Sequence, residues 1–309
     1  NNTMMGARAG EATTGHSNTI IGREAALQAT SMDECVVIGA SACGNGTVTG
    51  DNNVSIGVQS AFNMTSNSSQ VAIGYRALYL NTTGCCNVAI GRQAMYNHKT
   101  SCSNVGIGNS TLYNAKSGGC NVGIGECVLY ENWGGVNNVG IGRCSLRYNT
   151  TGTCNVALGN LALKSNTTGG DNFAAGYSSL ENNTTGYYNV AIGPQAMKKN
   201  TTSSYNIAFG HSPLWSNTNG EMNIAMGYQS LYYNISGNCN IGLGRETLQA
   251  SYGGDHNIAM GYVAMYGDGT TMITGNNNIA LGNSSMYDLE DGTGNIAIGC
   301  GAGGVESGD

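Results

Sequence analysis

A short pattern of apolar and polar residues repeats along the whole chain. Its clearest form is Asn-Val-Ala-Ile-Gly, and the closing glycine of this string occurs in eighteen copies, from Gly6 to Gly299. Between Gly57 and Gly261 each copy follows the previous one by 17 residues. Elsewhere the step is irregular only from Gly6 to Gly22, from Gly39 to Gly57 and from Gly261 to Gly282. A nearly constant step indicates a repeat architecture, in which each unit packs only against its neighbours.

Positions within the repeat are counted from this glycine, which is position 0. Position −3 is mostly Val or Ile, position −2 is small, position −1 is a larger apolar residue, and position +4 is Leu or Met. Alternation of this kind is typical of a β-strand, so positions −3 and −1 share one face and position −2 takes the other. We expect positions −3, −1 and +4 to fill the core.

The repeat predicts an all-β fold, a parallel β-solenoid of about 18 rungs. A 17-residue coil has room for two short strands and two turns, and identical positions on successive coils would lie about 4.8 Å apart. Residues 1–309 form one predicted domain, with a bulged loop at 266–277 where the step is longest. A helical repeat is the alternative, but its period would be about 20 residues or more.

Stacking of the coils predicts two columns of side chains, one of asparagine at position −4 and one of small residues at position −2. Asparagine at position −4 predicts a ladder of side-chain hydrogen bonds, although asparagine also suits a turn; its members are Asn87, Asn104, Asn121, Asn138 and Asn155. The small residues at position −2 predict an outward stripe for close packing against another chain, or alternatively a crowded inner face. The stripe includes Ala72, Ala89, Gly106, Gly123, Ala157 and Ala191.

Tyrosine occupies position +5 in four consecutive copies, at Tyr79, Tyr96, Tyr113 and Tyr130. Stacked coils would place these rings over one another. An aromatic column of this kind packs coil against coil, or binds sugar rings or another subunit.

Composition narrows the class of protein. The chain has 49 Gly, 40 Asn, and only 10% charged residues, which disfavours a helical protein and a disordered tail. A net charge of −6 with 12 Lys and Arg argues against nucleic-acid binding. No apolar run is long enough for a membrane span. The four histidines fall at different phases and the acids are scattered, so we expect no enzyme activity, metal or cofactor.

Asn-x-Ser/Thr sequences recur at position +7, where they would line one edge of the solenoid. In a secreted protein they are candidate glycosylation sites, while the same residues are also good turn formers. The six candidates in this column are Asn81, Asn149, Asn166, Asn183, Asn200 and Asn234.

The eleven cysteines favour an oxidising, extracellular setting. Cys127 and Cys144 are one full repeat apart, and so are Cys85 and Cys102. Stacking brings each pair into the Cα range of a disulfide, roughly 4.4–6.8 Å. The odd total leaves at least one thiol free or bonded between chains, and buried free thiols are the alternative to bridges.

The units N-V-A-I-G-R-Q-A-M-Y-N at 87–97 and V-A-I-G-Y-R-A-L-Y-L-N-T-T-G at 71–84 resemble the head repeats of trimeric autotransporter adhesins. They are also similar to repeat arrays of viral and bacterial tail-fibre-like proteins. The resemblance implies a left-handed β-roll, usually a trimer, on a cell or virion surface.

These observations predict an extracellular structural fibre subunit whose copies join head to tail into filaments. Joining the last copy to the first would continue the phase of the repeat, with the same step that separates Gly6 from Gly22, and strand addition would link the copies. The alternative is a trimeric adhesin or viral fibre shaft that attaches to a surface. Expected partners are copies of the chain itself, with glycans or a cell-surface receptor as further candidates.

Overall fold

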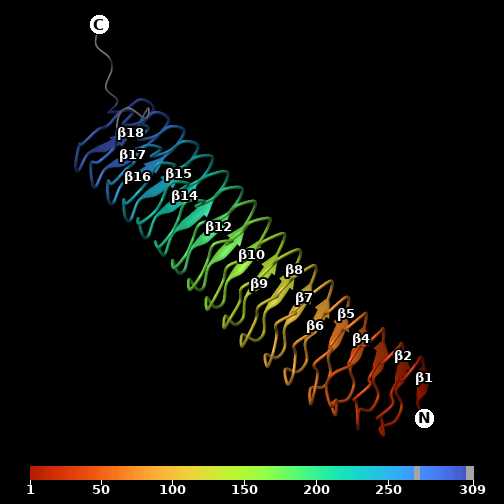
Figure 1. Ribbon diagram of the computed structural model, residues 1–309. Coiled ribbons are helices and arrows are strands. Elements are labelled where there is room, and N and C mark those ends of the chain that lie inside the picture. Colours follow the sequence, from red (N-terminus) through yellow and green to blue (C-terminus); the bar gives the residue numbers. More distant parts are fainter. Residues whose placement is uncertain (268–271, 304–309) are drawn as a thin grey trace. The chain divides into compact units, whose positions relative to one another are not determined.

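The computed structural model describes residues 1–267 and 272–303, and among them it contains no helix. The chain is an all-β parallel β-solenoid built as two compact units, Asn1–Cys154 and Asn155–Asp309. Among the described residues, each unit carries nine three-residue strands. Figure 1 draws the strands as arrows along the coils. Residues 268–271, within the loop expected at 266–277, lie outside the described residues.

The strands of the first unit are β1 (Thr3–Met5), β2 (Thr19–Ile21), β3 (Val36–Ile38), β4 (Val54–Ile56), β5 (Val71–Ile73), β6 (Val88–Ile90), β7 (Val105–Ile107), β8 (Val122–Ile124) and β9 (Val139–Ile141). Those of the second are β10 (Val156–Leu158), β11 (Phe173–Ala175), β12 (Val190–Ile192), β13 (Ile207–Phe209), β14 (Ile224–Met226), β15 (Ile241–Leu243), β16 (Ile258–Met260), β17 (Ile279–Leu281) and β18 (Ile296–Ile298).

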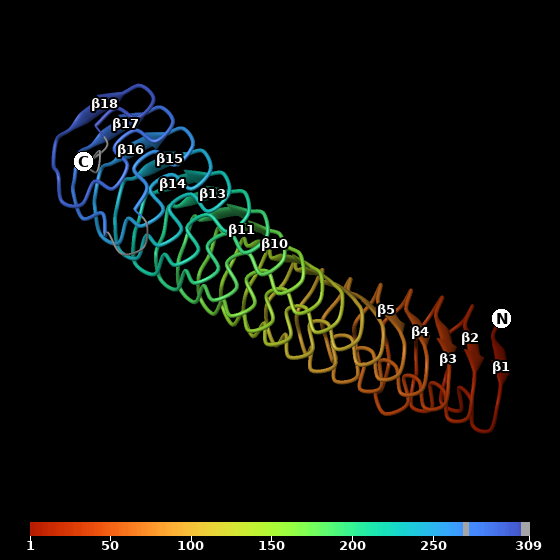
Figure 2. The same cartoon turned by 90° about the horizontal axis from the view of Figure 1, so that it is seen from above.

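Residues one repeat apart lie side by side, as predicted. Within each unit every strand pairs in parallel with the next, so that Val88 aligns with Val105 and Val105 with Val122. The longer steps do not disturb this register, because Val36 still aligns with Val54, and Ile258 with Ile279. The extra residue between Gly39 and Gly57 therefore lies outside the paired strands. Figure 2 shows the strands along one side of the coils of each unit.

Within the part of the chain that the structure describes, each coil contains one strand instead of the expected two. The second apolar segment forms turns, because the residues at positions +2 and +4 adopt left-handed backbone angles, as at Gln93 (φ 55°) and Met95 (φ 51°). Neighbouring coils still bond there, since the Met95 amide donates to the Thr111 carbonyl at 2.8 Å. The left-handed angles bend the chain back towards the next strand, which closes the coil.

The predicted orientation of the strand was wrong. Position −2 faces the core, whereas positions −3 and −1 face outward and are half-buried or exposed. The small residues proposed as an outward stripe are therefore buried inside the coil, namely Ala72, Ala89, Gly106, Gly123, Ala157 and Ala191. Alternation alone defines two faces without saying which one is internal. The expected core position +4 is correct, because Leu78, Met95 and Leu112 are fully buried.

The interior is too narrow for larger residues at position −2. A methyl group on Gly140 would lie 2.6 Å from the Val128 side chain of the preceding coil, which is closer than packed carbon atoms approach. The closing glycine is constrained differently: Gly57 has φ 132°, and a methyl group there would lie 2.7 Å from the Gly74 carbonyl oxygen. Small residues thus set how closely consecutive coils stack.

Candidate functional site: the outer sheet face and its edges

The outward side chains of the strands form a continuous apolar face on each unit, here called the V-x-I face. It consists of the residues at positions −3 and −1 of every strand. In the first unit Ile124 is 37% exposed and Ile141 40%. In the second unit Phe209, Met226 and Met260 are 37–41% exposed. Large contiguous apolar surfaces of this kind mark interaction sites in soluble proteins.

The asparagine ladder at position −4 is confirmed. The side chain of Asn104 donates to Asn87 Oδ1 at 3.3 Å, and Asn121 Nδ2 donates to Asn104 Oδ1 at 3.1 Å. The Asn121 Oδ1 atom in turn accepts the backbone amide of Asn138 at 2.9 Å. These side chains are fully buried, so the ladder satisfies backbone groups at the start of each strand and fixes the strand register.

A second ladder runs through position +7, where glycosylation was predicted. Asn183 Nδ2 donates to Asn166 Oδ1, and Asn200 Nδ2 to Asn183 Oδ1, both at 2.8 Å. N-linked sugars attach to this same nitrogen. All six predicted sites are fully buried, so the expectation is wrong for this fold at Asn81, Asn149, Asn166, Asn183, Asn200 and Asn234. The asparagine of the Asn-Thr-Thr-Gly sequence forms hydrogen bonds inside the coil, and the residues after it form the turn.

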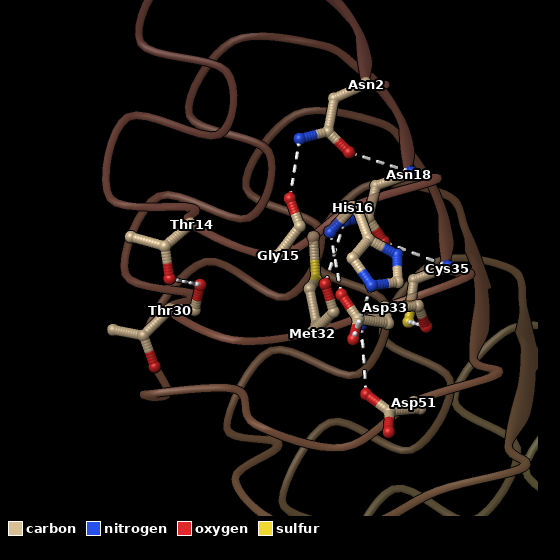
Figure 3. Close-up of polar contacts among 10 residues, drawn as sticks. All are labelled: Asn2, Thr14, Gly15, His16, Asn18, Thr30, Met32, Asp33, Cys35 and Asp51. Carbon is tan, nitrogen blue, oxygen red and sulfur yellow. Dashed lines mark hydrogen bonds and ion pairs between the residues drawn. The ribbon is translucent and has the colours of Figure 1, made fainter.

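A third column, at position −6, lies on the edge of the V-x-I face. Its side chains accept hydrogen bonds from backbone amides of the preceding coil. The backbone amide of His16 donates to Asp33 Oδ1 at 2.7 Å, and the backbone amide of Asp33 donates to Asp51 Oδ1 at 2.9 Å (Figure 3). Further along the chain, the Cys85 amide donates to Cys102 Sγ at 3.1 Å. Sequence reasoning missed this column because residue type varies along it, and only the ability to accept a hydrogen bond is kept.

All eleven cysteines are free thiols, so the predicted disulfides are absent from the structure. Both predicted pairs lie on adjacent coils in register, and in one of them the sulfur atoms are in contact, because Cys85 Sγ donates to Cys102 Sγ at 2.8 Å. That hydrogen bond is the main reason why the pKa of the Cys85 thiol is raised to about 11. Cys127 and Cys144 occupy equivalent positions on adjacent coils, but the Cys144 sulfur accepts from Arg147 at 3.7 Å. Among the buried thiols, burial raises the pKa of Cys43 to about 12.

The tyrosine column at position +5 packs coil against coil. Phe62 extends it by one ring, and successive rings lie 4.9–5.2 Å apart with planes within 5°. Arg147 occupies the same position in the next coil, with its guanidinium 5.7 Å from the Tyr130 ring centre. Because the rings cover one another's faces, the column presents ring edges to solvent, which fits packing better than sugar stacking.

One position of the second ladder holds a histidine. His98 is fully buried; its Nε2 lies 3.0 Å from the Asn104 amide nitrogen, and its Nδ1 has no hydrogen-bond partner. Burial lowers the pKa of this imidazole to about 4. His98 is therefore neutral in the folded protein at neutral pH.

Comparison with models of known protein families gives no match, and no curated protein matches the chain. Within the described residues, no helix has the length and hydropathy needed to cross a membrane. The V-x-I face and the stacked columns are the features of the chain that bear on its function.

Proposed function

We propose that the chain is a non-enzymatic, extracellular structural fibre subunit whose copies assemble with one another. The observation that carries this proposal is the V-x-I face. Apolar side chains at positions −3 and −1 repeat on most coils, and they remain partly exposed in the single chain. A second copy of the same face would cover them, because two sheets with matched apolar surfaces pack about 10 Å apart.

The size of the face fits such a contact. Nine coils give each unit a face about 40 Å long, with its two columns about 7 Å apart. A stable interface buries about 800 Å² on each partner. The face of one unit supplies on the order of half that area, so we expect both units to take part in assembly.

Residues beside the V-x-I face of the second unit are of the kind that interfaces favour. Tyr188, Tyr205 and Met222, at position −5, are 51–55% exposed. At position +1, the Arg245 guanidinium lies between the rings of Tyr228 and Tyr262, 5.4 and 5.7 Å from their centres. Tyrosine, methionine and arginine are enriched where protein surfaces meet.

Filament growth would use the second mode of contact, end-to-end addition of copies. Within each unit, described coils join their neighbours through parallel strand pairing and turn hydrogen bonds, and most of them also through the asparagine column at position −4. A coil of another copy would meet the same set of partners by strand addition. Heterologous contacts of this kind produce open filaments.

A trimeric adhesin or viral fibre shaft is the second candidate, and the V-x-I face favours it specifically. Each coil has a single apolar side, so three copies would bury all of their faces around one shared axis. The resemblance of the repeats to those of adhesin heads points in the same direction. This candidate differs from the filament in stoichiometry: it predicts closed assemblies of three chains.

Sedimentation equilibrium tests both candidates. The wild-type protein should form assemblies, and Ile124→Lys combined with Ile141→Lys should return it to monomer, because a longer, charged side chain at each position opposes face packing. Both residues already contact solvent, so we expect the variant to remain folded by circular dichroism. Thr83→Lys with Thr151→Lys is the matched control, since both residues are exposed on bends of the coil.

The mass distinguishes the outcomes. An open series of sizes supports the filament, and a single species of three chains supports the shaft. A wild-type protein that stays monomeric at tens of micromolar, or a lysine variant that assembles normally, would contradict the proposed function.

A further inference from the structure

Three exposed cysteines form a regular row along one edge of the first unit. Cys86, Cys120 and Cys154 all occupy position −5, just before the V-x-I face begins, and successive members are two repeats apart. They therefore recur on every second coil, while the intervening coils carry Ser103 and Asn137. These three residues are here called the cysteine row.

The spacing of the row prevents its members from bonding to one another. Two coils separate their Cα atoms by about 9.6 Å, whereas a disulfide needs roughly 4.4–6.8 Å. Folding cannot remove this mismatch, because the coil spacing is fixed by the backbone hydrogen bonds that flank each cysteine. The Cys120 amide, for example, donates to the Cys102 carbonyl at 3.2 Å.

The neighbouring thiols have a better partner in each other. Cys85 and Cys102 lie at the same position of adjacent coils, with their sulfur atoms 2.8 Å apart. Oxidation would join these two without moving a coil. Once they are paired, no cysteine at position −5 or −6 of an adjacent coil is left for the cysteine row, and Cys239, which also occupies position −5, lies five coils from Cys154.

We propose that the cysteine row is a cross-linking site that forms disulfides between two copies of this chain. The inference rests on the proposed function, because assembly of copies brings the second row into reach. The row borders the V-x-I face, so a copy seated near that face presents its own thiols at the same two-coil interval.

The chemistry is thiol–disulfide exchange with a low-molecular-weight disulfide. A cysteine thiolate of one copy attacks a sulfur of the small disulfide, forming a mixed disulfide and releasing one small thiolate. A thiolate of the second copy then attacks the protein sulfur of that mixed disulfide and releases the other small thiolate. Two cysteines are oxidised, one small disulfide is reduced to two thiols, and the two cysteine protons end on the released thiols.

The row is evenly spaced about Cys120, so its pattern matches a second copy in either orientation. Copies running in the same direction would join each cysteine to its own counterpart only if they meet through the edges that carry the row, because face-to-face packing in this orientation puts the two rows on opposite edges. Copies related by a two-fold axis across the chain would join Cys120 to Cys120 and Cys86 to Cys154 of the other copy. The linked peptides therefore also report how the copies are oriented.

The test uses oxidised glutathione on the assembled protein, followed by non-reducing electrophoresis and peptide mapping by mass spectrometry. Wild-type protein should give covalent dimers or larger products that dithiothreitol reverses, with row peptides linked between chains. Replacing all three row residues, Cys86→Ser, Cys120→Ser and Cys154→Ser, should reduce these products at least tenfold. The matched control, Cys85→Ser with Cys102→Ser, should keep them.

Sedimentation under reducing conditions separates this inference from the proposed function. If wild-type protein assembles when reduced but gives no inter-chain row peptides when oxidised, the cross-linking inference is overturned and assembly stands. Cross-links that persist in the triple serine variant would also overturn it. A protein that neither assembles nor cross-links contradicts both proposals.

Discussion

Single side chains decide how closely the coils stack. The closing glycine leaves no space for an added methyl group at most coils, and neither do Gly123 and Gly140 at position −2. The sequence pattern identified both columns as small, but it assigned position −2 to the wrong side. Gly106, Gly123 and Gly242 hold a signal that resolves the question, because their coils carry the larger Thr111, Val128 and Thr247 at position +3, where most coils carry Ala or Ser. Such compensation in size implies a shared interior, and a methyl group on Gly123 or Gly140 would meet Val128.

This compensation predicts a coupled pair of substitutions. Gly140→Ala should lower the free energy of unfolding by about 1–3 kcal/mol, because the new methyl group meets Val128 at 2.6 Å. In a Val128→Ala background the same change should cost much less, with a coupling energy of about 0.5–3 kcal/mol. Urea denaturation of the four proteins in this cycle measures it, and strictly additive values would contradict the packing described above.

His98 predicts a stability that depends on pH. Its pKa is about 4 in the folded chain and 6.5 for an ordinary histidine, so between these values the unfolded chain binds a proton that the folded chain does not. The stabilisation is complete above pH 6.5 and is lost as the pH falls towards 4. The lowered pKa corresponds to about 3 kcal/mol across this range.

His98→Asn is the control for this effect. Asparagine would extend the ladder from Asn81 and has no proton to gain, while all other titrating groups stay in place. Urea denaturation at pH 7.5 and pH 4.5 should therefore show a smaller loss of stability in the variant than in the wild type. Equal losses in the two proteins would place the titrating group elsewhere.

At the scale of the coil, the strand was predictable and the turns were not. The apolar alternation located every strand to the residue, and the constant step gave the register. The second expected strand is absent because Leu, Met, Gln and Cys adopt left-handed angles at positions +2 and +4. Nothing in these residue types signals such angles, which are more common for Gly and Asn. Stacking on neighbouring coils holds them there.

The tyrosine column provides an energetic test of coil-to-coil contacts. Tyr96 and Tyr113 stack with their centres 5.1 Å apart, and stacked pairs contribute about 0.5–1.5 kcal/mol beyond their buried area. A double-mutant cycle of Tyr96→Ala and Tyr113→Ala should return a coupling of this size. The pair Tyr79 and Tyr113, separated by one coil, should show coupling close to zero. Similar values for the two pairs would argue against stacking.

At the scale of the whole molecule, we expect that a complete coil can be removed without unfolding the protein. A deletion that shifts the columns of neighbouring coils out of register should not be tolerated. Deleting residues 109–125 removes one complete coil from the first unit and leaves every column continuous. The shortened protein should keep its circular dichroism and lose only the stability of one neighbour contact. Deleting 109–116 instead puts the columns out of phase and should unfold the affected coils. Equal effects of the two deletions on circular dichroism would contradict the stacking of positions one repeat apart.

The repeat predicted the parallel solenoid, its period and one amide ladder. It did not predict the second ladder, because Asn-x-Thr has two physical uses that only burial distinguishes. In the same way, a column of Val and Ile is typical of a protein core. Only the structure shows that the interior of this coil is too narrow for such side chains. The residues at positions −3 and −1, which the sequence pattern predicted to be internal, form the outer face from which we infer assembly.

Cryo-electron microscopy of the assembled protein tests that inference most directly. We expect cross-sections in which Val122 and Ile124 of one copy pack against the V-x-I face of another. Assemblies that leave this face open to solvent, with copies touching only through the turns of their coils, would contradict it.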